Sequence, residues 1–150
     1  MKQDVFLEEA RLGRRSDAII KYDEASNLAA MPRRFRCFSL VDLAHVVMLV
    51  ETGVLRRDRG AKLLGALIDI HRGGAAGFPF DPRSGSYLVQ IEHVLESRVG
   101  ADIGGRIQTG RSRNDQVATA DRLFMRDLLM EAAGDLLALY TDGVVESIGA

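Results

Sequence analysis

The chain has 150 residues, 47% of them hydrophobic, which suits one folded globular domain and excludes a chain that is disordered throughout. Its 20 basic and 21 acidic residues leave a net charge of -1, so no overall positive charge attracts nucleic acid or an anionic membrane. A single cysteine, Cys37, excludes an intrachain disulfide and a cysteine zinc cluster, and it favours a reducing, cytoplasmic setting.

Neither a secretory signal nor a membrane segment is expected. Residues 1–15 are charged throughout and lack the apolar core of a signal peptide. The longest apolar stretch, Leu43–Val50, is interrupted by His45 and is far shorter than the roughly 20 residues that span a bilayer. We therefore expect a cytoplasmic protein without a membrane partner.

The hydrophobic periodicity predicts an all-α fold. Apolar residues recur at three- and four-residue steps, and no segment of alternating β-branched residues is present. The first predicted helix covers residues 40–52, because Ser39 and Asp42 have the spacing of a capping box and Gly53 supplies a stop.

Two more helices follow on either side of a predicted loop. The second is expected to start near residue 57 and to end at Gly73-Gly74, where the helical spacing of leucines and isoleucines stops. The segment 73–86 is rich in glycine and proline, which is typical of a loop. The third helix is predicted over residues 87–99, with Gly100 at its end.

The last predicted element is one long helix from Ser112 to Ala150, after a short turn at Gly104-Gly105. Its apolar residues lie on more than one face, so it needs partners on more than one side. No cap is evident at Ala150. We therefore predict an N-terminal helical domain over residues 1–110 and the start of a truncated central helical bundle over residues 111–150.

The segment from residue 108 to residue 116 carries the chemistry. Ser112 and Asp115 again have capping-box spacing, which would place the free N–H groups of a helix start beside two arginines. Such an arrangement, with Arg111, Arg113 and Asn114 as donors, is suited to a carboxylate or phosphate. The alternative is that the serine and the aspartate only cap a helix and that the arginines are solvated or paired with neighbours.

The segment Thr109–Thr119, which reads TGRSRNDQVAT, resembles the first signature segment of the argininosuccinate lyases, within the fumarase/aspartase superfamily. The likeness continues through Asp121–Asp127. Residues 44–49 and Ile91-Glu92 fall where the family has similar helices.

The resemblance implies a mostly helical homotetramer in which each active site draws segments from three subunits. It implies a β-elimination without cofactor or metal, which releases fumarate and an amine from an amino-acid and dicarboxylate substrate such as argininosuccinate. By position, Arg113 and Asn114 would bind substrate groups, and Thr109 and Ser112 would contribute to the same binding site by shaping the loop.

The sequence departs from the family pattern at several positions. Gln108 stands where the family usually has histidine. The residues Gly85-Ser86-Tyr87-Leu88 stand where the family usually has an acidic pair and a histidine. Met31 falls near the place of a substrate-contacting aspartate. The family's catalytic histidine segment and serine base lie beyond a point matching Ala150. The catalytic residues are therefore unknown, and the chain is expected to be inactive alone.

The remaining candidates for chemistry have simpler explanations. Each histidine (His45, His71 and His93) fits a packing or surface role, and Cys37 fits a small buried hydrophobe. Two other functions stay open. One is a non-catalytic subunit or remnant of the lyase family that folds with a partner chain. The other is a DNA-reading helix-turn-helix over residues 39–70, with Arg56, Arg57 and Arg59 at the start of its recognition helix.

Overall fold

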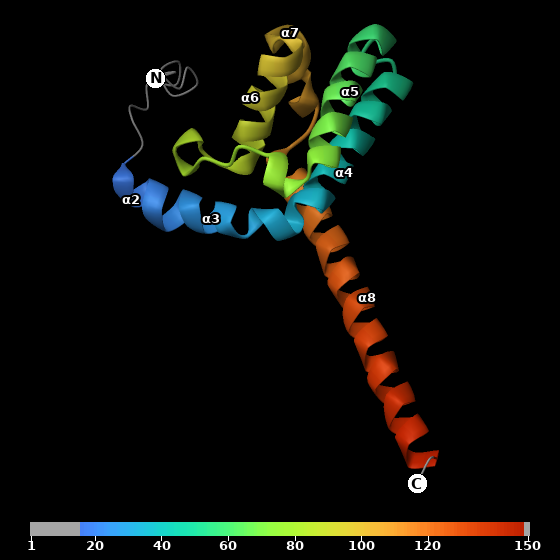
Figure 1. Ribbon diagram of the computed structural model, residues 1–150. Coiled ribbons are helices and arrows are strands. Elements are labelled where there is room, and N and C mark those ends of the chain that lie inside the picture. Colours follow the sequence, from blue (N-terminus) through green and yellow to red (C-terminus); the bar gives the residue numbers. More distant parts are fainter. Residues whose placement is uncertain (1–15, 149–150) are drawn as a thin grey trace.

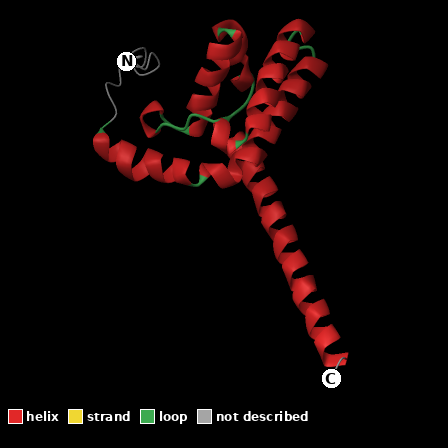
Figure 2. Ribbon diagram, in the orientation of Figure 1, coloured by secondary structure: helices red, strands yellow, loops and turns green. Residues whose placement is uncertain are grey.

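The structure is a computed structural model that describes residues 16–148, with side chains described as far as Thr141. Every regular element in this range is helical (Figure 2), which confirms the all-α class. The expectation about residues 1–15 lies outside the described residues. The α-helices are α2 (Asp17–Ile19), α3 (Ala25–Ala29), α4 (Met31–Glu51), α5 (Arg57–Gly73), α6 (Tyr87–Val99), α7 (Ala101–Gly104) and α8 (Arg113–Ile148). A π-helical turn, η1 (Ile20–Glu24), and the 3₁₀ turns η2 (Ala75–Gly77), η3 (Pro82–Ser84) and η4 (Gly105–Gln108) lie between them.

α4 begins earlier than predicted, and the expected capping box at Ser39 and Asp42 is wrong. Both residues are buried in the interior of the helix, which starts at Met31 with Pro32 in its first turn. The apolar stripe reaches upstream through Phe35 and Phe38, so packing extends the helix past the serine. The Ser39 hydroxyl donates to the Arg36 carbonyl within the same helix at 2.9 Å instead of capping it.

α4 and α5 form a helical hairpin and run side by side (Figure 1). Gly53, with a φ of 76°, lies in the turn between them, and the predicted stop there is confirmed. Leu63 and Leu67 of α5 belong to the hydrophobic core and are almost inaccessible to solvent. The hairpin and α6 enclose the core, in which Ile91 and Leu95 have no exposed surface.

The predicted loop between α5 and α6 contains only the short turns η2 and η3. An aromatic cluster fastens it to the helices: the Phe78 ring centroid lies 4.8 Å from that of Phe80 and 5.6 Å from that of Phe35 on α4. Tyr87, in the first turn of α6, completes the cluster at 5.8 Å from Phe35. Offset and edge-on contacts of this kind add to the apolar area that the rings bury.

The segment after Gly100 is more helical than the turn predicted for it. α7 and η4 fill it, and α7 packs closely on α6. A Cβ on Gly104 would lie 2.4 Å from the Glu96 backbone nitrogen, so only glycine permits this approach. The contact directs the chain back towards α4 just before the segment predicted to carry the chemistry.

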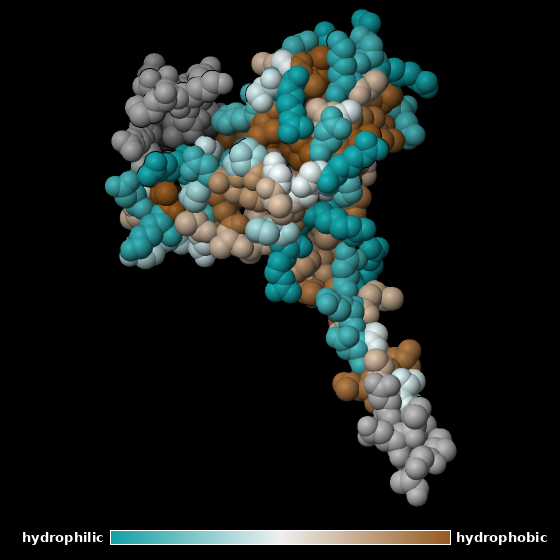
Figure 3. Space-filling view, viewed as in Figure 1, coloured by the Kyte–Doolittle hydropathy of each residue, from teal (hydrophilic) through white to brown (hydrophobic). Residues whose placement is uncertain are grey.

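α8 is a continuous helix through residue 148, as predicted for this range. Its first part joins the core: Gln116 and Ala120 are buried, Phe124 is partly buried, and Asp121 pairs with Arg34 of α4. Beyond Asp127, which still pairs with Arg36 of α4, α8 projects away from the other helices (Figure 1), and Figure 3 shows hydrophobic side chains along it. Within the described range, no helix combines the length and apolar character needed to cross a bilayer.

Candidate functional site

Residues 109–116, called the loop below, comprise the connection from η4 to α8 (Thr109 to Ser112) and the first turn of α8. Gly110 adopts a φ of 66°, in the left-handed region that favours glycine, and turns the chain into the helix. The Ser112 hydroxyl accepts a hydrogen bond from the Asn114 backbone nitrogen at 3.2 Å, so the predicted serine cap is present. Asp115 lies in the first turn of the helix, where a negative charge is favourable.

Thr109 is half-buried, and its backbone is held by α4. Its carbonyl oxygen accepts a hydrogen bond from His45 Nε2 at 3.1 Å. Burial, and then the nearby charge of Arg111, lower the pKa of His45, so the imidazole is neutral at pH 7 with its proton on Nε2. His45 therefore contacts the site through the loop backbone, in a position where the sequence indicated only a packing role.

The two arginines of the loop have different environments. Arg111 is buried, and its Nη2 donates to Asp42 Oδ1 at 2.8 Å, with side-chain exposures of 7% and 0%. The same Asp42 oxygen accepts from Gln116 Nε2 at 2.6 Å. Burial raises the pKa of Asp42 to about 6, although Arg111 acts in the opposite direction. The alternative of an arginine paired with a neighbour is thus correct for Arg111.

Arg113 and Asn114 lie exposed in the first turn of α8, beside the equally exposed Ser112. The charge of Arg113 lowers the pKa of Glu92 on α6, against the stronger effects of burial and of Glu96, which raise it. The loop therefore presents one cation and one amide to solvent, next to a helix N-terminus, with the acidic side of α6 close by. These donors suit a carboxylate.

Other positions singled out in the sequence have structural roles. Met31 and Tyr87 are buried in the core, at two of the places where the family pattern is missing. Gln108 Nε2 donates to Gln116 Oε1 at 3.5 Å, beneath the loop. Cys37 is buried as predicted, and burial raises the pKa of its thiol. No cluster of side chains that could hold a metal ion is found among residues 16–141.

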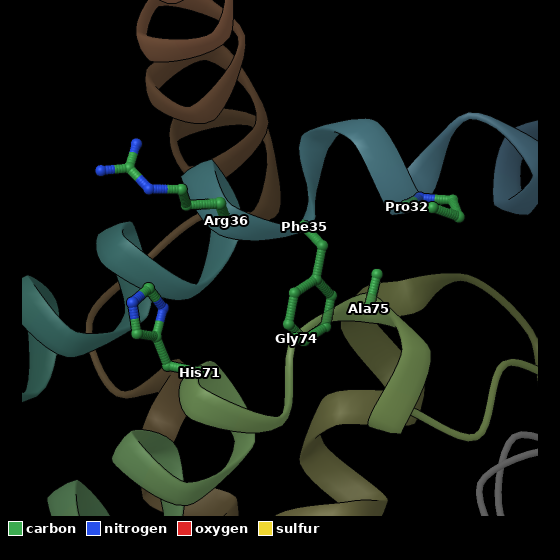
Figure 4. Close-up of a pocket in the computed structure, with 6 residues that line it drawn as sticks. All are labelled: Pro32, Phe35, Arg36, His71, Gly74 and Ala75. Carbon is green, nitrogen blue, oxygen red and sulfur yellow. The ribbon is translucent and has the colours of Figure 1, made fainter.

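A small cavity of about 220 Å³ lies elsewhere, between α4 and the end of α5; it is lined by Pro32, Phe35, Arg36, His71, Gly74 and Ala75. In Figure 4 the Arg36 guanidinium points away from Ala75 and Pro32. His71 Nδ1 lies 2.6 Å from the buried Ser39 hydroxyl, which itself donates to the Arg36 carbonyl. The Ser39 hydroxyl is buried within α4, so this pair has a structural role between α4 and α5.

Two of the three arginines considered for DNA contact are paired with acids. Arg56 Nε lies 3.1 Å from Asp58, and Arg59 Nη2 lies 3.0 Å from Asp102. These contacts neutralise much of the local basic cluster at the start of α5. No observation in the described structure favours a helix-turn-helix function.

No protein-family model matches the chain. Individual proteins do match. The chain is 33% identical over 137 residues to the argininosuccinate lyase of Methanocaldococcus jannaschii, and this alignment covers 91% of the chain and 28% of that protein. It is 39% identical over 100 residues to the enzyme of that name from Methanococcus maripaludis, covering 67% of this chain and 21% of the relative. The chain is 36% identical over 123 residues to the argininosuccinate lyase of Methanosarcina mazei, in an alignment that covers 82% of the chain and 24% of that relative. The chain thus spans about a quarter of the length of these relatives.

Proposed function

This chain is an argininosuccinate lyase-like member of the fumarase/aspartase superfamily, and on that premise we propose that it forms part of an enzyme that cleaves an argininosuccinate-like substrate. The reaction is a β-elimination without a cofactor. A base removes the proton on the carbon next to a carboxylate, the electron pair forms the double bond of fumarate, and the C–N bond breaks so that the amine leaves with a proton.

The contribution of this chain is a carboxylate-binding loop. The observation that carries the proposal is the different environment of the two arginines: Arg111 is buried in an ion pair, whereas Arg113 is exposed at a capped helix start. Asn114 adds a side-chain amide there, and Thr109 and Ser112 shape the loop. A guanidinium and backbone N–H groups directed at one place can bind a substrate carboxylate in a defined orientation.

The acid and the base of the reaction come from segments outside the described loop. His45 donates to a backbone carbonyl, His71 contacts Ser39, and His93 lies exposed on α6. We propose that the chain takes part in a homotetramer-like assembly in which a partner chain supplies the missing catalytic segments. The exposed apolar residues of α8 support such an assembly: Leu129, Leu136, Leu137, Leu139 and Tyr140 are each more than half exposed.

Turnover by the purified chain tests the need for these other segments. The chain is incubated with argininosuccinate while the ultraviolet absorbance of fumarate is followed. We expect no fumarate from the chain alone. Steady formation of fumarate would show that it contains a complete catalytic site, or that it forms one by self-assembly, and would contradict the proposal that it is inactive alone.

The role of the loop is tested in the assembled enzyme by Arg113→Ala. We expect kcat/KM to fall on the order of a hundredfold, the size that corresponds to a lost charged hydrogen bond of roughly 3 kcal/mol. Arg122→Ala is the matched control, because Arg122 is an exposed arginine of the same helix outside the loop. Equal kinetics for the two variants would reject the carboxylate-binding role.

A further inference from the structure

One buried carboxylate connects α4 to both sides of the α8 helix start. Asp42 Oδ1 accepts from Arg111 Nη2 at 2.8 Å, on the loop side of the Ser112 cap, and from Gln116 Nε2 at 2.6 Å, in the first turn of the helix. His45 lies three residues further along α4, on the same face, and donates to the Thr109 carbonyl. α4 therefore holds the loop at Thr109, Arg111 and Gln116.

The residues between these attachment points are those assigned to the substrate. Ser112, Arg113 and Asn114 are exposed, and none of their side chains takes part in the contacts with α4. Immobilising a loop before its ligand arrives reduces the ordering cost of binding. A small displacement of a charged binding group is costly, because its hydrogen bonds depend on distance and angle.

The buried pair is a poor device for stability alone. Asp42 is fully buried, and the side chain of Arg111 is nearly so, hence both charges have lost most of their hydration. Asp42 Oδ2, Arg111 Nε and Arg111 Nη1 have no hydrogen-bond partner among the described residues, so the pair only partly replaces the lost water contacts. Burial raises the pKa of Asp42, and the nearby charge of Arg111 acts in the opposite direction. Neutral side chains of similar volume would avoid this cost.

We propose that Asp42 is a positioning residue of the substrate loop: through Arg111 and Gln116 it fixes the start of α8, so that Arg113 and Asn114 are preorganised for a carboxylate. The identity of the ligand rests on the proposed function, but the control of loop order by Asp42 does not. If the aspartate is neutralised, Arg111 is left as a buried cation without a partner and the loop must rearrange to hydrate it.

The test compares two variants of the full chain. In Asp42→Asn the cation loses its partner, whereas in Asp42→Asn combined with Arg111→Met both charges are absent and the amide oxygen can still accept from Gln116. Asp58→Asn is the control, because it removes an aspartate from an exposed pair with Arg56. For each protein, thermal unfolding, amide hydrogen exchange of residues 109–116 and binding of argininosuccinate at the Asn114 amide by NMR are measured.

We expect Asp42→Asn to speed exchange in the loop about tenfold and to weaken argininosuccinate binding by a similar factor. The unfolding temperature at pH 7 should not fall, because the raised pKa of Asp42 favours a neutral group at this position. In the double variant the loop should still exchange faster than in wild type and binding should stay weak. A purely structural role predicts that loop exchange and binding follow the unfolding temperature in both variants, and that result would overturn the proposal. Unchanged loop exchange in both variants would also overturn it.

The two proposals fail in different ways. If the wild-type chain shows no shift of the Asn114 amide with millimolar argininosuccinate, the carboxylate-binding role of this chain alone is rejected. Loop exchange then still decides whether Asp42 fixes the helix start, because that measurement needs no ligand.

Discussion

The packed body of the molecule, residues 17–127, and the projecting part of α8, residues 128–148, use the same kinds of residue in different environments. Leu63 and Leu95 in the body have no exposed surface, whereas Leu137 and Leu139 on the projecting part are 64% and 72% exposed. Both regions are helical throughout their regular elements. The comparison shows that local sequence is sufficient to specify a helix, while burial of its apolar residues requires partners.

The largest effect is expected for a leucine in the body. Leu63→Ala removes a fully buried side chain of α5 from the core, and it should lower the free energy of unfolding by about 4 kcal/mol through lost burial and a residual cavity. Urea unfolding followed by circular dichroism measures this change. A loss below about 1 kcal/mol would mean that the hairpin is not a close-packed core.

The stability of the protein should depend on pH through Asp42, because burial raises the pKa of its carboxyl group from 3.8 to about 6. Between these pH values the folded state binds more protons than the unfolded chain, so stability falls as the pH rises through this window. The stability difference between wild type and Asp42→Asn should therefore fall by roughly 2 kcal/mol from pH 4 to pH 6.5. If it rises instead, the pairing with Arg111 exceeds the cost of burial.

Alanine substitutions at Gly104 and Gly134 should change stability in opposite directions. Gly104→Ala places a methyl group against the α6 backbone and should cost about 2 kcal/mol. Gly134→Ala meets no atom within 4 Å and should stabilise the projecting helix by up to about 1 kcal/mol. Thermal unfolding reports the first substitution, and amide exchange within α8 reports the second. A destabilised Gly134→Ala variant would indicate that α8 packs closely against a partner at that position.

The smallest effect on monomer stability is expected for Leu137→Ala. Because this side chain is already mostly exposed, the loss should stay below about 0.5 kcal/mol in dilute protein. At higher concentration the same substitution should weaken self-association, measured by sedimentation. Identical association of wild type and variant would exclude this part of α8 from the assembly interface.

Several elements followed from local patterns alone. The glycines at 53 and 100 end their helices, and the serine at 112 begins α8, because these residues satisfy or terminate backbone groups within a few positions. The sequence predicts the start of α4 at the wrong residue, because Ser39 is of a residue type that often caps helices but is buried inside this one. Its burial against α5 depends on a helix more than twenty residues away, which no local pattern reveals.

The sequence by itself determined that two arginines flank a helix start in a lyase-like segment, because capping and motif are local properties of the chain. Only the tertiary structure decided their different roles. Arg111 finds its partner, Asp42, 69 residues earlier in the chain, and that contact exists because α4 packs against the loop and α8. Arg113, two residues later in the sequence, lies exposed in the first turn of the same helix. Burial depends on the packing of distant segments, and it therefore distinguishes two residues that local spacing treats alike.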